Sequence, residues 1–361
     1  MKLLYKTILL VLLLPTITLA NDTNPKWKHN KEKTIKKEFN VNKDAGLRVD
    51  NSYGNIDIIT WSENRTVIEV TIKASGNDEE AVQEKLEMTT VEFTANGSLV
   101  TAKTKFGEKS GTSWNLWGKK NSISIEVNYK IKLPVTNTVD LDNSYGSISI
   151  NKLEGNAKIN CDYGQLIIGE LLAENNYINF DYTDKSTIRY MKSGKIDADY
   201  SAFTLDETER LELVADYTQS QILKVGDLNF NCDYGKISIG DSGDILGRGD
   251  YLNTSIGAVS GNLNLNTDYG SVKVDKLLKS AKNVTISSDY TGVKLGIENG
   301  YNFDFAMTLS YADLSGKDLV TITNSDKGYT NKKYLGYHGS KNSGNKMNIN
   351  SSYGGITLTK N

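Results

Sequence analysis

The chain has 361 residues and a formal net charge of −2 at pH 7. This near balance disfavours nucleic acids and anionic membranes as partners, because both are bound through a surplus of Lys and Arg. Two His and two Cys leave little material for metal or nucleophile chemistry, whereas 31 Gly, 20 Tyr and three Pro fit an all-β protein with many tight corners.

Residues 1–20 have the pattern of a secretory signal peptide. Lys2 and Lys6 give a positive start, residues 8–14 are apolar, and small residues precede a cleavage point after Ala20. The alternative is an N-terminal membrane anchor, but the apolar run is short for a bilayer span. We therefore expect an exported mature chain without a transmembrane segment, located in the periplasm, on the cell surface or outside the cell.

Residues 21–43 form a polar leader in which Lys residues outnumber Glu32 and Glu38. A basic arm of this kind can hold anionic surface polymers or lipid headgroups. A solvated tether is the more common role, and it is the one we expect here.

Residues 44–135 are predicted to hold the first copy of a repeat, at Tyr53, followed by a cap. Strands are expected at 65–73, 91–94, 99–105 and 122–133, and a helix at 77–88 with Asn77 or Asp78 as N-cap. A repeat array needs its open end covered, because an unpaired edge invites aggregation. Trp114 and Trp117, on a polar loop, suggest either sugar binding or burial against the cap.

Residues 136–361 are predicted to form the repeat array, whose spacing indicates a solenoid. From Tyr145 to Tyr311 the repeated tyrosines lie 17 to 21 residues apart. The twelve aligned copies are centred on Tyr53, Tyr145, Tyr163, Tyr182, Tyr200, Tyr217, Tyr234, Tyr251, Tyr269, Tyr290, Tyr311 and Tyr353.

The flanks of each tyrosine predict two short strands per repeat. The residue four positions before the tyrosine is apolar in every copy except Gly247, and the residue five positions after it is apolar except at Thr187 and Gly316. Within each flank the spacing of two is strand periodicity. The alternation of apolar and polar positions shifts by one residue just after the tyrosine, where six copies carry Gly, so a bend is expected there. Because the tyrosine recurs at the same place in each repeat, its ring is expected to stack on that of the next repeat.

These patterns predict an all-β chain folded as a single-stranded, right-handed parallel β-helix or β-roll of about twelve coils. The handedness follows from the strong bias of parallel crossovers. The layout of an export signal, a Tyr-Gly strand pair, an inserted strand-helix-strand unit ending at Pro134 and many Gly-containing strand pairs resembles the bacterial "putative adhesin" domain families. That resemblance, over residues 40–361, implies an envelope β-helix and no catalytic residue.

Acidic residues precede the tyrosine in eight successive repeats. Stacked about 4.8 Å apart, these carboxylates would repel one another by roughly 1 kcal/mol in water. One explanation is that each accepts backbone N–H groups and holds the corner; another is that the column binds Ca²⁺. The residues are Asp162, Asp181, Asp199, Asp216, Asp233, Asp250, Asp268 and Asp289.

Other chemistry is weakly indicated. Enzymatic β-helices need carboxylates beside strong cations, and only Arg248 offers one near the acidic column. Arg248-Gly249-Asp250 spells an integrin-binding tripeptide but is expected on a sheet edge and not at a mobile loop tip. Cys161 and Cys232 fall four repeats apart, too far for a disulfide. We predict a monomeric, non-enzymatic binding or adhesion protein without a cofactor, whose partner is a glycan or protein of the envelope or extracellular space. The alternatives are a rigid envelope scaffold without a ligand and a polysaccharide-active enzyme.

Overall fold

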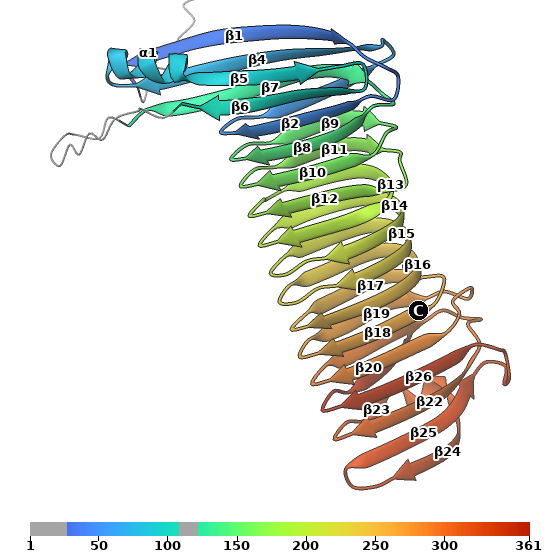
Figure 1. The fold of residues 1–361 in the computed structure, drawn as a ribbon. Coiled ribbons are helices and arrows are strands. Elements are labelled where there is room, and N and C mark those ends of the chain that lie inside the picture. Colours follow the sequence, from blue (N-terminus) through green and yellow to red (C-terminus); the bar gives the residue numbers. More distant parts are fainter. Residues whose placement is uncertain (1–26, 108–121) are drawn as a thin grey trace, which may run out of the picture.

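The computed structural model describes residues 27–107 and 122–361. The signal-peptide prediction and the loop with Trp114 and Trp117 lie outside these residues. The described chain is all-β, with one α-helix and 27 strands in a single hydrogen-bonded sheet. Figure 1 shows the repeats stacked in an elongated array between an N-terminal cap and a C-terminal hairpin.

The N-terminal part contains the first repeat and the cap. Its elements are β1 (His29–Asn40), β2 (Gly46–Ser52), β3 (Ile56–Trp61), β4 (Arg65–Gly76), α1 (Glu79–Met88), β5 (Thr89–Ala95), β6 (Leu99–Phe106) and β7 (Ser124–Pro134). Strands β6 and β7 pair in parallel with β2 and β3. Antiparallel β5, β4 and β1 then continue the sheet beyond them.

The strands and the helix predicted between residues 65 and 133 are present. The helix α1 begins after Asp78, whose side chain accepts the Ala81 N–H at 3.0 Å, and it buries Val82 and Leu86. The leader differs from the prediction, because residues 29–40 are not a solvated tether. They form β1, which pairs with β4 along its whole length and turns Ile35 and Phe39 toward the core.

The central repeats stack in register, each strand pairing in parallel with the equivalent strand of the next repeat. The strands are β8 (Thr138–Ser144), β9 (Ile148–Leu153), β10 (Ala157–Asp162), β11 (Leu166–Leu171), β12 (Asn176–Asp181), β13 (Ser186–Asp199), β14 (Ala202–Val214), β15 (Gln219–Asn231), β16 (Lys236–Asp250), β17 (Asn253–Val259), β18 (Leu263–Asp268), β19 (Ser271–Leu277), β20 (Val284–Asp289) and β21 (Gly292–Ile297). The strands that end at the tyrosine form one ladder, from β8 to β20, and those that follow it form a second. Strands β13 to β16 belong to both ladders because they run without a break from one tyrosine to the next.

At the C-terminal end the last repeat is inserted between the two repeats before it. Strand β26 pairs in parallel with β20 on one side and β22 on the other, and β27 lies between β21 and β23. The antiparallel hairpin of β24 and β25 then covers β22. The bounds are β22 (Phe303–Ser310), β23 (Leu314–Ser315), a 3₁₀ turn at Lys317–Leu319, β24 (Thr321–Lys327), β25 (Asn331–His338), β26 (Lys346–Ser352) and β27 (Ile356–Lys360).

The core confirms the predicted inward positions and corrects the corner. All residues four positions before the tyrosine are buried, including Ile196 with no exposed surface. Thr187 is exposed and Ile188 is buried in its place, because the repeat has an extra residue near Lys185, whose φ is +57°. The left-handed residue of the corner is the tyrosine itself and not the residue after it.

Candidate functional site: the tyrosine ridge and the aspartate column

The repeated tyrosines form one unbroken stack along the array, which we call the tyrosine ridge. Neighbouring ring centroids lie 4.6–5.2 Å apart, with interplanar angles of 1–9°. The stacking that the repeat predicted is therefore present. Along the stack the order is Tyr53, Tyr145, Tyr163, Tyr182, Tyr200, Tyr217, Tyr234, Tyr251, Tyr269, Tyr290, Tyr353 and Tyr311.

Every tyrosine of the ridge has left-handed backbone geometry, with φ between +47° and +61°. This conformation costs a residue with a Cβ about 1–2 kcal/mol. Each aromatic contact contributes about 0.5–1.5 kcal/mol beyond burial, and an interior ring has two such contacts. The stack therefore offsets the strain of the corner.

The residue after the tyrosine is small in every repeat except that of Leu252, because the backbones of adjacent repeats approach closely there. A Cβ on Gly146 would lie 1.9 Å from the carbonyl oxygen of Gly54. Other repeats use a hydroxyl residue at this position: Thr218 Oγ1 accepts the Ser201 N–H at 3.1 Å and donates to the Asp216 carbonyl at 2.9 Å. Close packing of the backbone, and not a positive φ, thus explains the glycine in the Tyr-Gly motif.

The ridge is a solvent-facing surface. Its tyrosines are 47–60% exposed. Because each ring lies flat against its neighbours, the exposed parts are ring edges and the hydroxyl-bearing ends. The pKa of Tyr163, Tyr200, Tyr234 and Tyr353 is raised, first by desolvation and then by the neighbouring phenols and carboxylates. These four phenols therefore stay neutral hydrogen-bonding groups at physiological pH.

The eight aspartates lie in one column beside the ridge, as the sequence predicted. All are half-buried except the exposed Asp250. The Oδ1 atoms of Asp181, Asp199, Asp216 and Asp233 accept the backbone N–H of the aspartate in the next repeat at 2.7–3.2 Å, and Asp268 accepts that of Asp289 at 3.1 Å. Five of the eight carboxylates are thus hydrogen-bond acceptors, but the donor belongs to the next repeat and not to the corner.

The surroundings of the column disfavour the ionised form of several of its aspartates. The pKa values of Asp181, Asp216 and Asp250 are raised, mainly by desolvation and further by adjacent carboxylates. Within the described residues no group of three or more His, Cys, Asp or Glu side chains is arranged to hold a metal ion. Calcium binding by the column therefore stays an untested hypothesis, the second of the two explanations drawn from the sequence.

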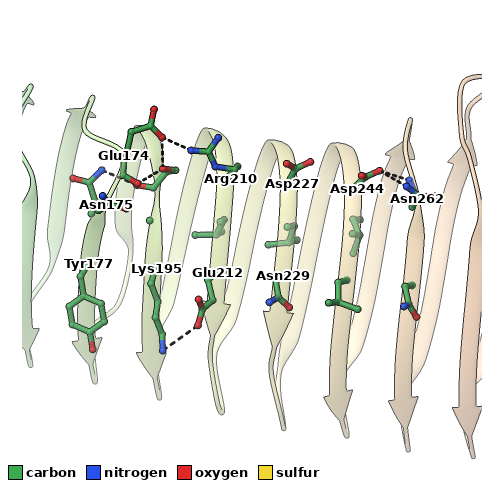
Figure 2. Close-up of a pocket in the computed structure, with 18 residues that line it drawn as sticks. Glu174, Asn175, Tyr177, Lys195, Arg210, Glu212, Asp227, Asn229, Asp244 and Asn262 are labelled. Atoms are coloured by element: carbon green, nitrogen blue, oxygen red, sulfur yellow. Dashed lines mark hydrogen bonds and ion pairs between the residues drawn. The ribbon is translucent and has the colours of Figure 1, made fainter.

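A hollow of about 860 Å³ crosses the strands of the first ladder, and we call it the polar groove. Figure 2 shows its two rows of side chains: Glu174, Arg210, Asp227, Asp244 and Asn262 near the turn, and Tyr177, Lys195, Glu212 and Asn229 further along the strands. The groove runs along the stacking direction because equivalent positions of successive repeats line it.

Bonds between repeats fix several of these side chains. Arg210 and Lys192 form ion pairs with Glu174, and Lys195 lies 3.5 Å from Glu212. Asp244 Oδ1 accepts the backbone N–H of Asn262 at 2.6 Å. The sequence reasoning missed this groove, since its residues vary from repeat to repeat and belong to no motif.

The remaining candidate residues lie apart. His29 is in β1 and His338 in β25, at opposite ends of the array. Arg248 to Asp250 lie in strand β16 and not on a loop, as predicted, but they are not on a sheet edge, because β15 and β18 flank β16 on its two sides. Cys161 and Cys232 are free and buried, as predicted, and burial raises the pKa of both thiols to about 12.

No helix in the described part of the chain has the length and apolar character needed to cross a membrane. No family model and no curated protein matches the sequence.

Solved structures that the fold matches include putative adhesins, as the sequence resemblance predicted. One, from Parabacteroides distasonis, is 12% identical with a TM-score of 0.34, and the match covers 73% of this chain and 93% of that one. A putative lipid binding protein from the same species is 9% identical with a TM-score of 0.28, covering 90% and 96%. A putative cell adhesion protein from Clostridium sporogenes is 9% identical with a TM-score of 0.18, covering 92% and 100%. At these identities and scores the likeness carries no argument about function.

Proposed function

We propose that this chain is an exported protein of the cell envelope or cell surface that binds an external macromolecule, as an adhesin does, without catalysing a reaction. The observation that carries the proposal is the tyrosine ridge, a row of twelve half-exposed aromatic side chains. Contiguous exposed aromatic surface on this scale is unusual on a monomeric protein and marks interaction sites.

The ridge suits a partner with repeated polar groups. Its rings follow one another at 4.6–5.2 Å, so the hydroxyl-bearing ends form a regular row of donors and acceptors. Stacking holds each ring in place, so binding would immobilise few side chains and would lose little entropy. The neighbouring carboxylates add acceptors along the same line.

We also propose that the repeats form a right-handed parallel β-helix. The parallel pairing of equivalent strands in successive repeats supports it. Crossovers between parallel strands of one sheet are right-handed in the great majority of proteins.

Export is proposed from the signal-peptide pattern of residues 1–20. N-terminal sequencing of the mature protein should then give Asn21 as the first residue.

One observation favours the alternative of a rigid scaffold without a ligand. The faces of the ridge rings, which are the surfaces that usually stack on ligands, are covered by neighbouring rings. The ridge would then serve stability alone.

Replacing Tyr200, Tyr217 and Tyr234 together with Phe separates the two functions. These substitutions keep the rings and remove the hydroxyls. If the ridge binds, retention of the purified protein on isolated bacterial envelopes, or on immobilised glycans and matrix proteins, should fall while the melting temperature changes little. Unchanged retention would argue against the ridge as the contact surface, and absence of retention for the natural chain would favour the scaffold.

A further inference from the structure

The polar groove of Figure 2 lies on a different part of the repeats from the tyrosine ridge. We propose that it binds a neutral linear oligosaccharide lying along the stacking direction of the repeats. This inference rests on the proposed binding function and names the chemical class of one ligand.

The shape of the groove fits an extended chain. Its lining comes from equivalent positions in six successive repeats, from Tyr177 in β12 to Asn264 in β18. A ligand lying along it would meet one new pair of side chains about every 4.8 Å, the spacing of paired strands. The volume of about 860 Å³ lies within the range of small-molecule sites.

The charges of the groove argue against an anionic ligand. Four carboxylates, of Glu174, Glu212, Asp227 and Asp244, line it together with two cations, Lys195 and Arg210. Both cations already contact a carboxylate, Lys195 that of Glu212 and Arg210 that of Glu174. An acidic polysaccharide or a nucleic acid would therefore meet net negative charge.

Polar side chains in the groove that have no partner among the described residues can hydrogen-bond to sugar hydroxyls. In the part of the chain that the structure describes, the side chains of Asn229, Asn264 and Asp227 form no hydrogen bond or ion pair, and all three are exposed. An amide donates and accepts, and a carboxylate accepts from two hydroxyls, which is the pairing that vicinal diols need. Half-buried Tyr177 and exposed Leu246 add the apolar surface on which a sugar ring can lie.

The backbone argues against an extended peptide as the occupant. Such peptides bind by adding a strand to a free sheet edge. The strand segments that carry the groove, in β12 to β16 and β18, are hydrogen-bonded to neighbours on both sides. Side chains alone face the ligand, which suits a polyhydroxylated chain.

The test is calorimetric titration of the purified protein with linear hexasaccharides. Neutral gluco-, xylo- and manno-oligosaccharides serve as probes, and an oligogalacturonate of the same length is the anionic comparison. We expect saturable binding of at least one neutral probe and weaker or absent binding of the oligogalacturonate. Binding of no neutral probe, or preference for the anion, would overturn the inference.

Matched variants locate the site. Asn229→Ala and Asp227→Asn should each weaken binding roughly tenfold, the effect of one lost hydrogen bond of ordinary strength. Tyr177→Ala should weaken binding, whereas Tyr177→Phe should retain it because the ring remains. The control is Asn348→Ala, which removes an exposed amide at the position equivalent to Asn229 but outside the groove. An equal loss of affinity in the control would place the sugar elsewhere.

The oligosaccharide titrations test the groove separately from the envelope-retention test of the proposed function. Groove variants that lose oligosaccharide binding and keep envelope retention support a second, independent site. Retention by the natural chain without binding of any neutral probe contradicts the groove inference alone.

Discussion

Tyr353 stacks on Tyr290 at 4.6 Å with its ring 2° from parallel, although Tyr311 lies between them in the sequence. The contact arises because β26 pairs with both β20 and β22. The column of rings therefore follows the order of the strands in space and not the order of the repeats along the chain. Strand pairing thus determines which rings stack on one another.

Tyr217 offers a test of strain against stacking. Its ring lies 4.8 Å from that of Tyr200 and 4.9 Å from that of Tyr234, and its φ is +54°. Tyr217→Ala should lower the free energy of unfolding by about 1–3 kcal/mol, since two stacking contacts are lost. Tyr217→Gly should be about 1 kcal/mol more stable than the Ala variant, because Gly accepts the left-handed backbone without a penalty.

Urea denaturation of the variants measures these differences. Tyr217→Phe is the control and should remain close to the natural chain. A Gly variant less stable than the Ala variant would show that the corner is not strained.

Inward and outward positions of one strand pair should respond differently to charge. Ile196 is fully buried, so Ile196→Asp would place an unpaired carboxylate between repeats and lower the free energy of unfolding by more than about 3 kcal/mol. Asn179→Asp, on the outer face of β12, should change it by less than about 1 kcal/mol. Similar melting shifts for the two variants would contradict the assigned faces.

The aspartate column should make the fold less stable as pH rises. Asp216 has a raised pKa in the folded chain, so between the ordinary Asp pKa and this raised value the folded state binds more protons than the unfolded state. The free energy of unfolding contributed by this group therefore falls as pH increases through that window. Asp216→Asn should raise the melting temperature at pH 7 and have little effect well below the ordinary Asp pKa.

Asp313 provides the control of opposite sign. Hydrogen bonds from Lys332 and Lys317, both at 3.0 Å, hold its pKa below the ordinary value. Its contribution is present above the ordinary Asp pKa and is lost as pH falls through the lowered value. Asp313→Asn should therefore lower the melting temperature at pH 7, by a modest amount because solvent screens this exposed carboxylate. Shifts of the same sign at Asp216 and Asp313 would refute the assignment.

Calcium should leave the melting temperature unchanged. Backbone N–H groups of the next repeat already occupy acceptor positions on five of the eight aspartates. We therefore expect thermal melts in EDTA and in millimolar Ca²⁺ to coincide. A melting temperature that climbs with Ca²⁺, and no longer does so when several of these aspartates are changed to Asn, would establish the cation hypothesis instead.

The two cysteines should be unreactive in the folded protein. Burial raises the pKa of Cys161 and Cys232 to about 12, so the reactive thiolate is scarce at neutral pH. A thiol reagent should find two thiols after denaturation and almost none before it. Absence of thiols in the unfolded, monomeric protein would mean that the two residues form a disulfide and that the strand register is wrong.

Much of the fold was predictable because the sequence repeats it. The period placed Ile196 and its equivalents in the core, and Asn77 or Asp78 was expected to begin the helix, of which Asp78 is the N-cap. The parity change predicted a bend but misplaced it by one residue, since positive φ is uncommon for a bulky Tyr and the adjacent Gly is the usual residue for it. Strand β1 was missed because Lys31, Lys33 and Lys37 alternate in step with Ile35 and Phe39, so the sequence shows no apolar face there.

Of the candidate sites, the aspartate column could be predicted from the sequence and the polar groove could not. The aspartate column is a regular feature of the repeat, so its alignment followed from spacing alone. The polar groove is not, because residues such as Tyr177 and Asn229 become neighbours only through the lateral register of strands. The sequence around each of these residues does not show that they line the same groove, because they differ from repeat to repeat.

The insertion of β26 and β27 between earlier strands constrains the order of folding. Strands β22 and β23 cannot settle against the array until the last strands have arrived, because β26 and β27 occupy the space between β22–β23 and β20–β21. While the chain emerges during synthesis or export, the array can therefore grow repeat by repeat only as far as β21. Strands β22, β24 and β25 can pair with one another earlier, but they join the sheet of the array only through β26 and β27, which leaves that segment open to proteases and chaperones until those two strands are in place.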